Sequence, residues 1–383
     1  MNRPAWITLV LLLAWTLPAR STTLQVSFEV ADPARPGRVV PTLAVAPAAA
    51  TAPCPLLIIG HATMTPADHY LDLAEPLAEA GWLVLIPDSE PGLPGDQPAL
   101  AADMLCLVDM ARDGAAPWPS ELPPVSGDWA LMGHSLGGGA AVLAAAESSP
   151  DALVLLAPQD RARPSMIALA GDVRAPTLLL TGVLDCLTPP EQHHDPLHQA
   201  LDAVPRAMVR LLGGGHCGFA TPCEPCMGAE LGCPSELSAD VMQAITLGLA
   251  RPWLDWHVRG ENEAHGQLLA ALSGPHVSSD LVGPVTAAAP LATTRLRLTS
   301  ASVGAGVFSW RLDGESEVAE GMATVFDLRG RRVRSLSARS NGPSMAWRWD
   351  GRDGAGQGAP AGVYVMRVTM GRVVHSSRVV RVD

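Results

Sequence analysis

Lysine is absent from this chain, because all 26 basic residues are arginine. The absence excludes chemistry that needs a lysine amine, such as a Schiff base, a pyridoxal phosphate anchor, a phosphate-loop lysine or a Ser-Lys dyad. Charged residues are few, at 17%, and hydrophobic residues make up 48% of 383 positions. The composition therefore indicates a globular protein of about two to three domains and excludes a disordered tail.

Long apolar runs are lacking beyond the N-terminus. The chain begins Met-Asn-Arg, continues with an apolar run from Ala5 to Leu17, and then has small residues at Ala19 and Ser21. This order is typical of a cleaved secretory signal peptide, and the run is shorter than the ~20 residues of a spanning helix. We predict a signal peptide over residues 1–21, no membrane span in the mature protein, and a secreted or cell-surface location. A retained anchor is the alternative.

Charges of opposite sign dominate the two parts of the chain. Residues 291–383 have 14 Arg against 8 acidic residues, whereas residues 1–290 have 12 Arg against 30. Such asymmetry suggests two domains. The acidic part lacks the clustered basic residues that bind phosphates, so nucleic acid is excluded as its partner.

Short apolar runs alternate with helical stretches from residue 24 to 258, as in a parallel sheet with crossover helices. Two earlier runs, Leu24–Val30 and Val39–Val45, predict an antiparallel hairpin at the sheet edge. We predict a doubly wound, mostly parallel α/β domain over residues 22–260, followed by a terminal helix and linker over 261–290. The six central runs are Leu56–Ile59, Leu83–Ile86, Trp129–Met132, Ala152–Leu156, Thr177–Leu180 and Met208–Leu212.

After residue 290 the pattern changes to short strands separated by glycine-rich turns. This pattern predicts a smaller C-terminal β-sandwich over residues 291–383, without a catalytic constellation. The predicted strands are Arg295–Thr299, Gly306–Leu312, Ala323–Asp327, Met345–Trp349, Val363–Met370 and Val373–Val382.

A Gly-x-Ser-x-Gly motif follows the third central run, as Gly133-His134-Ser135-Leu136-Gly137, and an alanine-rich helical stretch comes next. A nucleophilic serine occupies such a sharp turn between strand and helix, where larger neighbours would clash. A packing turn with an idle serine is the alternative. The strand before the motif and the helix after it favour Ser135 as a nucleophile.

A serine nucleophile needs an imidazole base, which a carboxylate orients. In this type of fold the chain order is Ser, acid, His. Asp185 follows the fifth central run and His216 the sixth, which places both at the sheet edge where ligands bind. We predict the triad Ser135, Asp185 and His216. Asp160 and Asp172 are weaker candidates for the acid, because neither directly follows a strand.

The tetrahedral intermediate of such a reaction needs two backbone N–H donors. Leu136, directly after the nucleophile, supplies the first. Thr63, in the loop after the first central run, is the second by its position. His61 in that loop is expected to orient it rather than to act as a base.

Residues 24–258 resemble the dienelactone hydrolase-like branch of α/β-hydrolases, near platelet-activating-factor acetylhydrolase, chlorophyllase and cutinase-type polyester hydrolases. The resemblance implies hydrolysis of carboxylic esters without a cofactor. Ala62 departs from it, because relatives usually have His-Gly where this chain has His61-Ala62, and alanine would narrow the oxyanion loop. The matching segments are Gly60-His61-Ala62-Thr63-Met64 through Tyr70, Leu77–Val84 leading to Pro87-Asp88, Gly133-His134-Ser135-Leu136-Gly137-Gly138, the Asp185 loop and Gly215-His216-Cys217.

The C-terminal region contains Asp-x-x-Gly-Arg from Asp327, Trp-x-Trp-Asp-Gly-x-Asp from Trp347 and Pro-x-Gly-Val-Tyr from Pro360. In this order the motifs resemble the immunoglobulin-like domain of flagellar hook-capping proteins and the C-terminal sorting domains of type IX secretion cargo. The resemblance implies a structural or sorting role, with the secretion machinery or the cell surface as partner.

Five of the seven cysteines lie between residues 186 and 233. With His216 they offer the ligands of a zinc site, but disulfides persist in an exported protein and His216 is already assigned to catalysis. We therefore favour a disulfide-linked insertion and expect no metal. Cys106, in an apolar helical stretch, is the expected free thiol. The block reads Cys217-x5-Cys223-x2-Cys226-x6-Cys233.

A second metal candidate is the pattern His193-His194-Asp195-x2-His198, in which two histidines are one helical turn apart. A hydrated helix face explains this pattern more simply. We expect no metal there either.

Cys186 and Cys217 each directly follow a predicted triad residue. If the acid and base loops meet, these cysteines approach each other and a disulfide between them becomes feasible. A similar bridge occurs among the polyester hydrolases that the domain resembles. Cys223, Cys226 and Cys233 are competing partners for Cys217.

Two functions of different classes follow from these observations. The first is a secreted serine hydrolase that cleaves a small-molecule or polymeric carboxylic ester through an acyl-serine intermediate. The second is a catalytically silent cell-surface binding protein that keeps the hydrolase scaffold. The fold alone does not distinguish them.

Overall fold

The computed structural model describes residues 22–283 apart from 51, 91, 94, 114–118 and 234, and 297–381 apart from 303–307, 314–319, 328–330, 340–343 and 371–372. The predicted signal peptide lies outside the described residues. The chain divides into two compact units, residues 1–289 and 290–383. In the described part, no helix is both long enough and apolar enough to cross a membrane.

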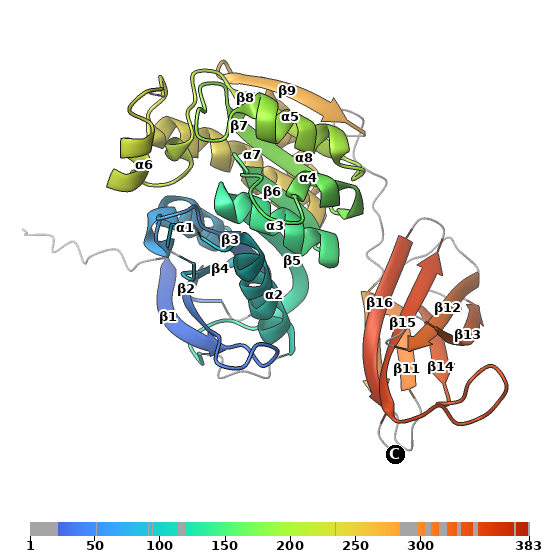
Figure 1. The fold of residues 1–383 in the computed structure, drawn as a ribbon. Helices are drawn as coiled ribbons and strands as arrows, with labels where there is room; N and C mark the ends of the chain where they lie inside the picture. Colours follow the sequence, from blue (N-terminus) through green and yellow to red (C-terminus); the bar gives the residue numbers. More distant parts are fainter. Residues whose placement is uncertain are drawn as a thin grey trace, which may run out of the picture. The chain divides into compact units, whose positions relative to one another are not determined.

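The N-terminal unit is built on a nine-stranded sheet with the strand order β1-β2-β4-β3-β5-β6-β7-β8-β9 (Figure 1). The six strands from β3 to β8 are parallel to one another, whereas β1, β2 and β9 run antiparallel to their neighbours. The prediction of a mostly parallel α/β sheet with an antiparallel hairpin at its edge is confirmed. The strands are β1 Thr23–Ala31, β2 Val39–Pro47, β3 Cys54–Gly60, β4 Leu83–Pro87, β5 Val125–His134, β6 Ala152–Leu156, β7 Thr177–Gly182, β8 Arg206–Leu211 and β9 Val277–Val282.

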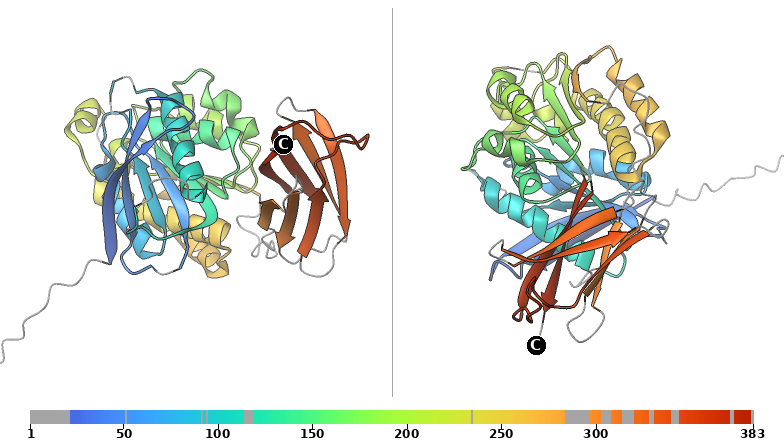
Figure 2. Two further views of the ribbon diagram at one scale, coloured as in Figure 1. Left: turned by 90° about the horizontal axis from the view of Figure 1, so that it is seen from below. Right: turned by 90° about the vertical axis from the view of Figure 1, so that its right-hand side faces the viewer.

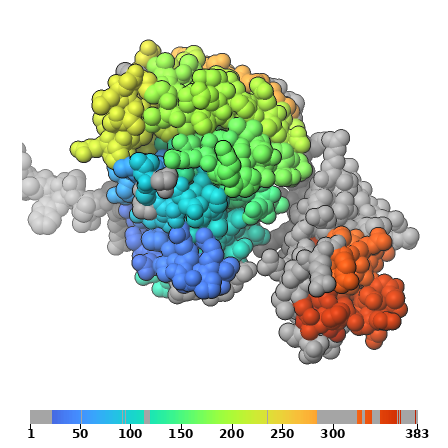
Figure 3. Space-filling view, in the orientation of Figure 1, coloured from blue at the N-terminus to red at the C-terminus, as the bar shows by residue number. Residues whose placement is uncertain are grey.

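Helices cover both faces of this sheet (Figure 2). One face packs against α2 to α5, and the other against α1, α7 and α8. In the space-filling view, the yellow segment that contains α6 borders the blue segment that follows β3 (Figure 3). The helices are α1 Leu71–Glu79, α2 Gln97–Asp113, α3 Leu136–Glu147, α4 Met166–Leu169, α5 Pro190–Ala200, α6 Glu224–Ala229, α7 Ala239–Arg259 and α8 Asn262–Leu272, with 3-10 turns η1 Ala67–Tyr70, η2 Ala170–Asp172 and η3 Cys217–Phe219.

Strand β3 shows why the central runs are apolar throughout. Leu56 and Ile58 belong to the core on one face, and Leu57 and Ile59 belong to the core on the other. Successive side chains of a strand point to opposite faces, so a strand covered on both sides has no exposed positions. All four side chains are 0% exposed.

The segment expected as a terminal helix and linker, residues 261–290, contributes more than a helix. Its helix α8 is followed by β9, which pairs antiparallel with β8 and forms the last strand of the sheet. Its side chains are exposed or partly exposed, because it lies at an edge. An edge strand needs no continuous apolar run, and for this reason the sequence pattern did not reveal it.

The C-terminal unit contains two antiparallel sheets, with the orders β10-β11-β14 and β13-β12-β15-β16. This arrangement fits the predicted second, smaller β domain. Strand β13 was missed from sequence; it too is an edge strand with a polar, arginine-rich sequence. The ring of Tyr364 packs edge-on against Trp349, 4.9 Å between centroids, and its hydroxyl donates to Pro360 O over 2.6 Å. The strands are β10 Arg297–Ser302, β11 Phe308–Asp313, β12 Glu320–Asp327, β13 Arg332–Arg339, β14 Ser344–Trp349, β15 Gly362–Met370 and β16 Val373–Arg381.

The division into two units predicts that residues 22–289 fold without the C-terminal unit. We expect this fragment to unfold cooperatively on heating, whereas a fragment that ends at residue 275 and lacks β9 should unfold at least about 5 °C lower, because the edge of β8 is left unpaired. Circular dichroism melting of both fragments measures the difference. A fragment 22–289 that fails to fold would show that the C-terminal unit is part of the same folding unit.

Candidate active site

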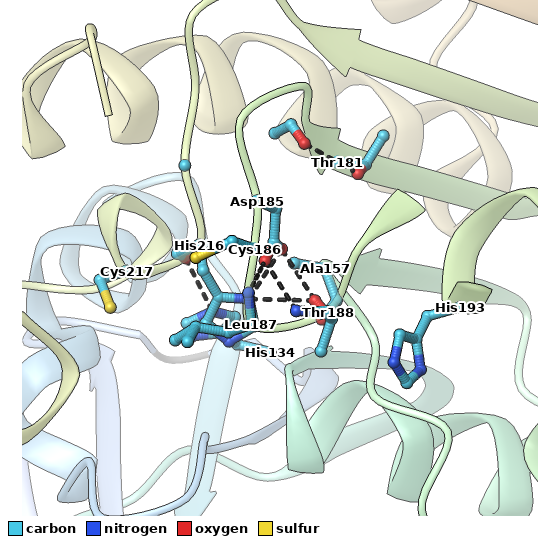
Figure 4. Close-up of polar contacts among 12 residues, drawn as sticks. His134, Ala157, Thr181, Asp185, Cys186, Leu187, Thr188, His193, His216 and Cys217 are labelled. Carbon is cyan, nitrogen blue, oxygen red and sulfur yellow. Dashed lines mark hydrogen bonds and ion pairs between the residues drawn. The ribbon is translucent and has the colours of Figure 1, made fainter. Parts of the chain in front are cut away.

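The three predicted triad residues follow three parallel strands of one sheet. Ser135 comes after β5, Asp185 after β7 and His216 after β8. The carboxyl ends of parallel strands lie at the same edge of a sheet, so the topology brings the three loops together. Figure 4 shows Asp185, Thr188 and His216 turned toward one another at this edge.

Ser135 occupies the sharp turn between β5 and α3. Its φ of 54° lies in the left-handed region, which is strained for a residue with a side chain. Neighbouring glycines allow this turn to pack closely: a Cβ on Gly133 would lie 2.1 Å from Gly137 O, and one on Gly137 would lie 2.2 Å from the carbonyl of Gly60. The turn has the form that holds a nucleophile at the end of a strand.

Asp185 and His216 are in direct contact, with Asp185 Oδ2 2.7 Å from His216 Nδ1. The Thr188 hydroxyl donates to the same oxygen over 2.8 Å, and the N–H groups of Leu187 and Thr188 donate to Oδ1. Burial raises the pKa of Asp185, but the hydrogen bonds from His216 and Thr188 outweigh it and bring this pKa below its ordinary value. The ionised carboxylate keeps the proton on Nδ1, which leaves Nε2 of His216 able to accept one.

His134, fully buried, links the Ser135 turn to the His216 loop. Its Nε2 lies 3.1 Å from the carbonyl oxygen of His216, which can only accept, so we assign the ring proton to Nε2. Its Nδ1 then accepts the Tyr70 hydroxyl over 2.9 Å. Burial first, and then the neighbouring His216, place the pKa of His134 well below its ordinary value, so this ring stays neutral.

The same chain of hydrogen bonds continues to the predicted oxyanion loop. The Tyr70 oxygen accepts the N–H of Ala62 over 2.8 Å, directly before Thr63. On the other side of Ala62, the carbonyl of His61 accepts the N–H of Gly137 over 3.0 Å. The loop that contains Thr63 is therefore held against the start of α3, where Leu136 is the first residue and its N–H has no helical partner.

The predicted base, His216, is less directly connected to the predicted nucleophile, Ser135, than to the predicted acid, Asp185. Among the described residues, no hydrogen bond joins the Ser135 hydroxyl to His216. The ring of His216 lies 4.9 Å, centroid to centroid, from that of His134, the residue before Ser135. The arrangement brings the imidazole of His216 beside the turn that contains Ser135.

The predicted Cys186–Cys217 disulfide is wrong. Cys186 pairs with Cys233, with 6.2 Å between their Cα atoms, and Cys217 pairs with Cys226, at 5.8 Å. The prediction assumed that the acid and base loops are bridged directly. Each of the two cysteines instead bonds to a cysteine in the segment that contains α6, at Cys226 or Cys233. Three thiols stay free, those of Cys54, Cys106 and Cys223.

The weaker candidates have other surroundings. Asp160 accepts from the Ser165 hydroxyl and the N–H of Met166 at the start of α4, so it caps a helix. The ring of His61 contacts the carbonyls of Ala62 and Ser89, consistent with an orienting role for this residue. In the described part of the chain, no group of three or more His, Cys, Asp or Glu side chains is arranged to hold a metal ion.

His194, from the second metal pattern, is fully buried and its Nδ1 lies 2.6 Å from the Thr181 hydroxyl. Burial lowers the pKa of His194 to about 3. His198 is also only 5% exposed. The prediction of a hydrated helix face is therefore wrong for these two histidines, which are buried.

Sequence analysis missed three contributors to this site, Thr188, His134 and Tyr70. The signal for Thr188 was its place three residues after Asp185, where a hydroxyl can fold back onto the carboxylate. His134 and Tyr70 are 64 residues apart in the chain. Their contact depends on how η1, which ends at Tyr70, packs near the end of β5, and no local pattern reveals this packing.

The mostly parallel sheet with helices on both faces, and the sharp turn at Ser135 between β5 and α3, fit an α/β-hydrolase fold. Residues 125–229 match the family model of PET hydrolase-like proteins, and residues 297–372 match that of the FlgD Ig-like domain. The first match includes all three predicted triad residues. The comparison with curated proteins found no match. Both family resemblances are confirmed, and the first match supports an ester hydrolase of the α/β-hydrolase superfamily.

Replacing Tyr70 with phenylalanine tests the chain of hydrogen bonds. The variant leaves the N–H of Ala62 and Nδ1 of His134 buried without a partner, so we expect a loss of about 1–3 kcal/mol in unfolding free energy and a fall in kcat of about 10-fold for ester hydrolysis. Urea unfolding and steady-state kinetics measure both effects.

The matched control is Tyr364→Phe, which removes the hydroxyl of the other of the 2 tyrosines, in the C-terminal unit. It should leave kcat unchanged. Equal kcat values for the two variants would mean that the Tyr70 hydroxyl does not position the oxyanion loop.

Proposed function

We propose that this protein is a secreted serine hydrolase that cleaves carboxylic esters through an acyl-serine intermediate. The observation that carries the proposal is the buried Asp185–His216 pair, 2.7 Å apart, at the sheet edge where the strained turn presents Ser135. The PET hydrolase-like match supports ester chemistry and makes polyesters a substrate class to test beside small esters.

In this mechanism Nε2 of His216 takes the hydroxyl proton of Ser135 while the serine oxygen attacks the ester carbonyl. Asp185 holds the imidazole in the required tautomer and stabilises the imidazolium that forms. The same nitrogen then returns the proton to the leaving alcohol, and an acyl-serine remains. Water, which gives a proton to His216, then attacks the acyl carbonyl; the carboxylic acid leaves, and His216 returns the proton to the Ser135 oxygen.

The N–H groups of Leu136 and Thr63 bind the oxyanion in the proposed mechanism. Support comes from the Gly137–His61 hydrogen bond of 3.0 Å, which fixes the two donor segments side by side. Such preorganised donors stabilise the charge as it develops on the carbonyl oxygen. Alanine at position 62 is accommodated in this loop with 3% of its surface exposed.

For the C-terminal unit we propose a structural or sorting role, through contact with secretion machinery or the cell surface. The FlgD Ig-like match over residues 297–372 supports this proposal. Hydrolysis itself is assigned to the N-terminal unit, which contains every residue of the proposed mechanism.

A fluorophosphonate probe tests the nucleophile directly. Wild-type protein should be labelled and Ser135→Ala should not, with at least a 10^4-fold loss of kcat/KM on a nitrophenyl ester. Ser148→Ala, at the opposite end of α3, is the matched control and should behave as the wild type. Absence of labelling in the folded wild type would instead support a catalytically silent binding protein.

The pH dependence of kcat/KM tests the base. The pKa of Asp185 is lowered and that of His134 lies well below its ordinary value, so neither group titrates near neutrality. Activity requires a neutral base, so it should rise with pH as a single proton is lost. A flat profile from pH 5 to 8, or full activity in His216→Ala, would rule out His216 as the base.

A further inference from the structure

A cysteine-rich segment, residues 217–235, follows His216 directly and contains α6. Two disulfides connect it to the candidate active site, one to Cys186 beside Asp185 and one within the segment at Cys217 beside His216. The acid loop and the base loop are thus both attached to the region around α6. This gives the segment a position from which it can fix both loops.

Glu230, at the end of α6, makes the closest polar contact between this segment and the base loop. Its Oε1 accepts the backbone N–H of Cys217 over 3.0 Å and that of His216 in a shorter hydrogen bond. These N–H groups lie at the start of η3 and have no partner within that turn. A carboxylate that accepts two N–H groups forms charge-assisted hydrogen bonds, which are stronger than neutral ones.

The backbone before His216 is shaped to admit this carboxylate. A Cβ on Gly215 would lie 2.6 Å from Glu230 Oε1, so any larger residue at this position would displace the carboxylate. The N–H of Gly215 donates to the Ser235 hydroxyl over 3.1 Å, from the other end of the segment. Three successive N–H groups, from Gly215 to Cys217, are therefore bound by the cysteine-rich segment.

The segment also contacts the side of the site that contains the oxyanion loop. The N–H of Thr221 donates to His69 O over 2.8 Å, and its hydroxyl donates to Asp72 over 2.7 Å. The Sγ atom of Cys223 lies 3.7 Å from the Thr65 hydroxyl, two residues after Thr63. Figure 3 shows the corresponding yellow and blue segments bordering one another.

We propose that Glu230 is a positioning residue for His216: its carboxylate fixes the His216 backbone, and so directs the imidazole toward both Asp185 and Ser135. The inference rests on the proposed function and names a further residue of the same site. Glu230 touches neither the reacting atoms nor the imidazole ring in this assignment. It acts through the backbone, with the two disulfides holding α6 in place.

Three substitutions at this position separate the effect of the acceptor from that of the charge. Glu230→Ala removes the acceptor, so we expect kcat to fall about 10- to 100-fold with KM within about 2-fold, because a displaced base slows the chemical step. Glu230→Gln retains a carbonyl oxygen and should keep kcat within about 3-fold. Glu230→Asp withdraws the carboxylate by one methylene and should lose at least about 5-fold. Glu224→Ala, at an exposed position of the same helix, should equal the wild type.

A second readout does not depend on catalysis. The proton on His216 Nδ1, bonded to Asp185, gives a downfield NMR resonance that should be retained in the Gln variant and broadened in the Ala and Asp variants. If the wild type hydrolyses esters and Glu230→Ala has the same kcat and the same resonance, the inference is overturned. If Gln loses as much activity as Ala, the acceptor role is also overturned. Failure of the proposed function would appear differently, as an inactive wild type with the resonance still dependent on Glu230.

Discussion

The parallel pairing of β5, β6, β7 and β8 is the constraint on which the site depends. It places the loops after β5, β7 and β8 at one edge of the sheet, so residues up to 81 positions apart in the chain are brought together. Close packing then sets the finer geometry: α3 begins so near the end of β3 that a Cβ on Gly137 would lie 2.2 Å from the carbonyl of Gly60. The turn that contains Ser135 and the loop that contains Thr63 are adjacent for this reason.

Two buried polar groups of the site, Asp185 and His134, differ in their charge state. Asp185 remains charged because four donors surround its two oxygens, including the ring of His216. His134 remains neutral because burial, and then the neighbouring His216, lower its pKa, and its two partners, a carbonyl and a hydroxyl, suit an uncharged ring. A neutral histidine between the Ser135 turn and the His216 loop adds no charge that would compete with the Asp185–His216 pair. His134 also fixes which group donates in each hydrogen bond of the series: Ala62 N–H donates to Tyr70, Tyr70 donates to His134, and His134 donates to the His216 carbonyl.

Local patterns predicted the fold class, the Ser135 turn and the positions of Asp185 and His216, because a buried strand and a glycine-flanked turn leave a signal within about ten residues. Edge strands such as β9 leave a weaker one, since polar side chains are allowed there. Disulfide pairing left none: Cys217 bonds to a cysteine 9 residues away and Cys186 to one 47 residues away, and spacing does not rank such alternatives. The contacts of Tyr70 and Glu230 arise only when separate segments pack together.

Strand β9 also bears on how copies of the protein behave toward one another. A sheet edge presents unpaired backbone groups that can recruit a strand from a second molecule. Here the last strand exposes Ser278, Ser279 and Asp280 along that edge. Strand β9 is short, its exposed centre is polar, and Asp280 adds a negative charge. It is therefore a poor template for pairing with a strand of a second molecule. Among the described residues, the segment that looked like a spacer in the sequence thus ends the sheet with a strand whose exposed centre disfavours pairing with a second molecule.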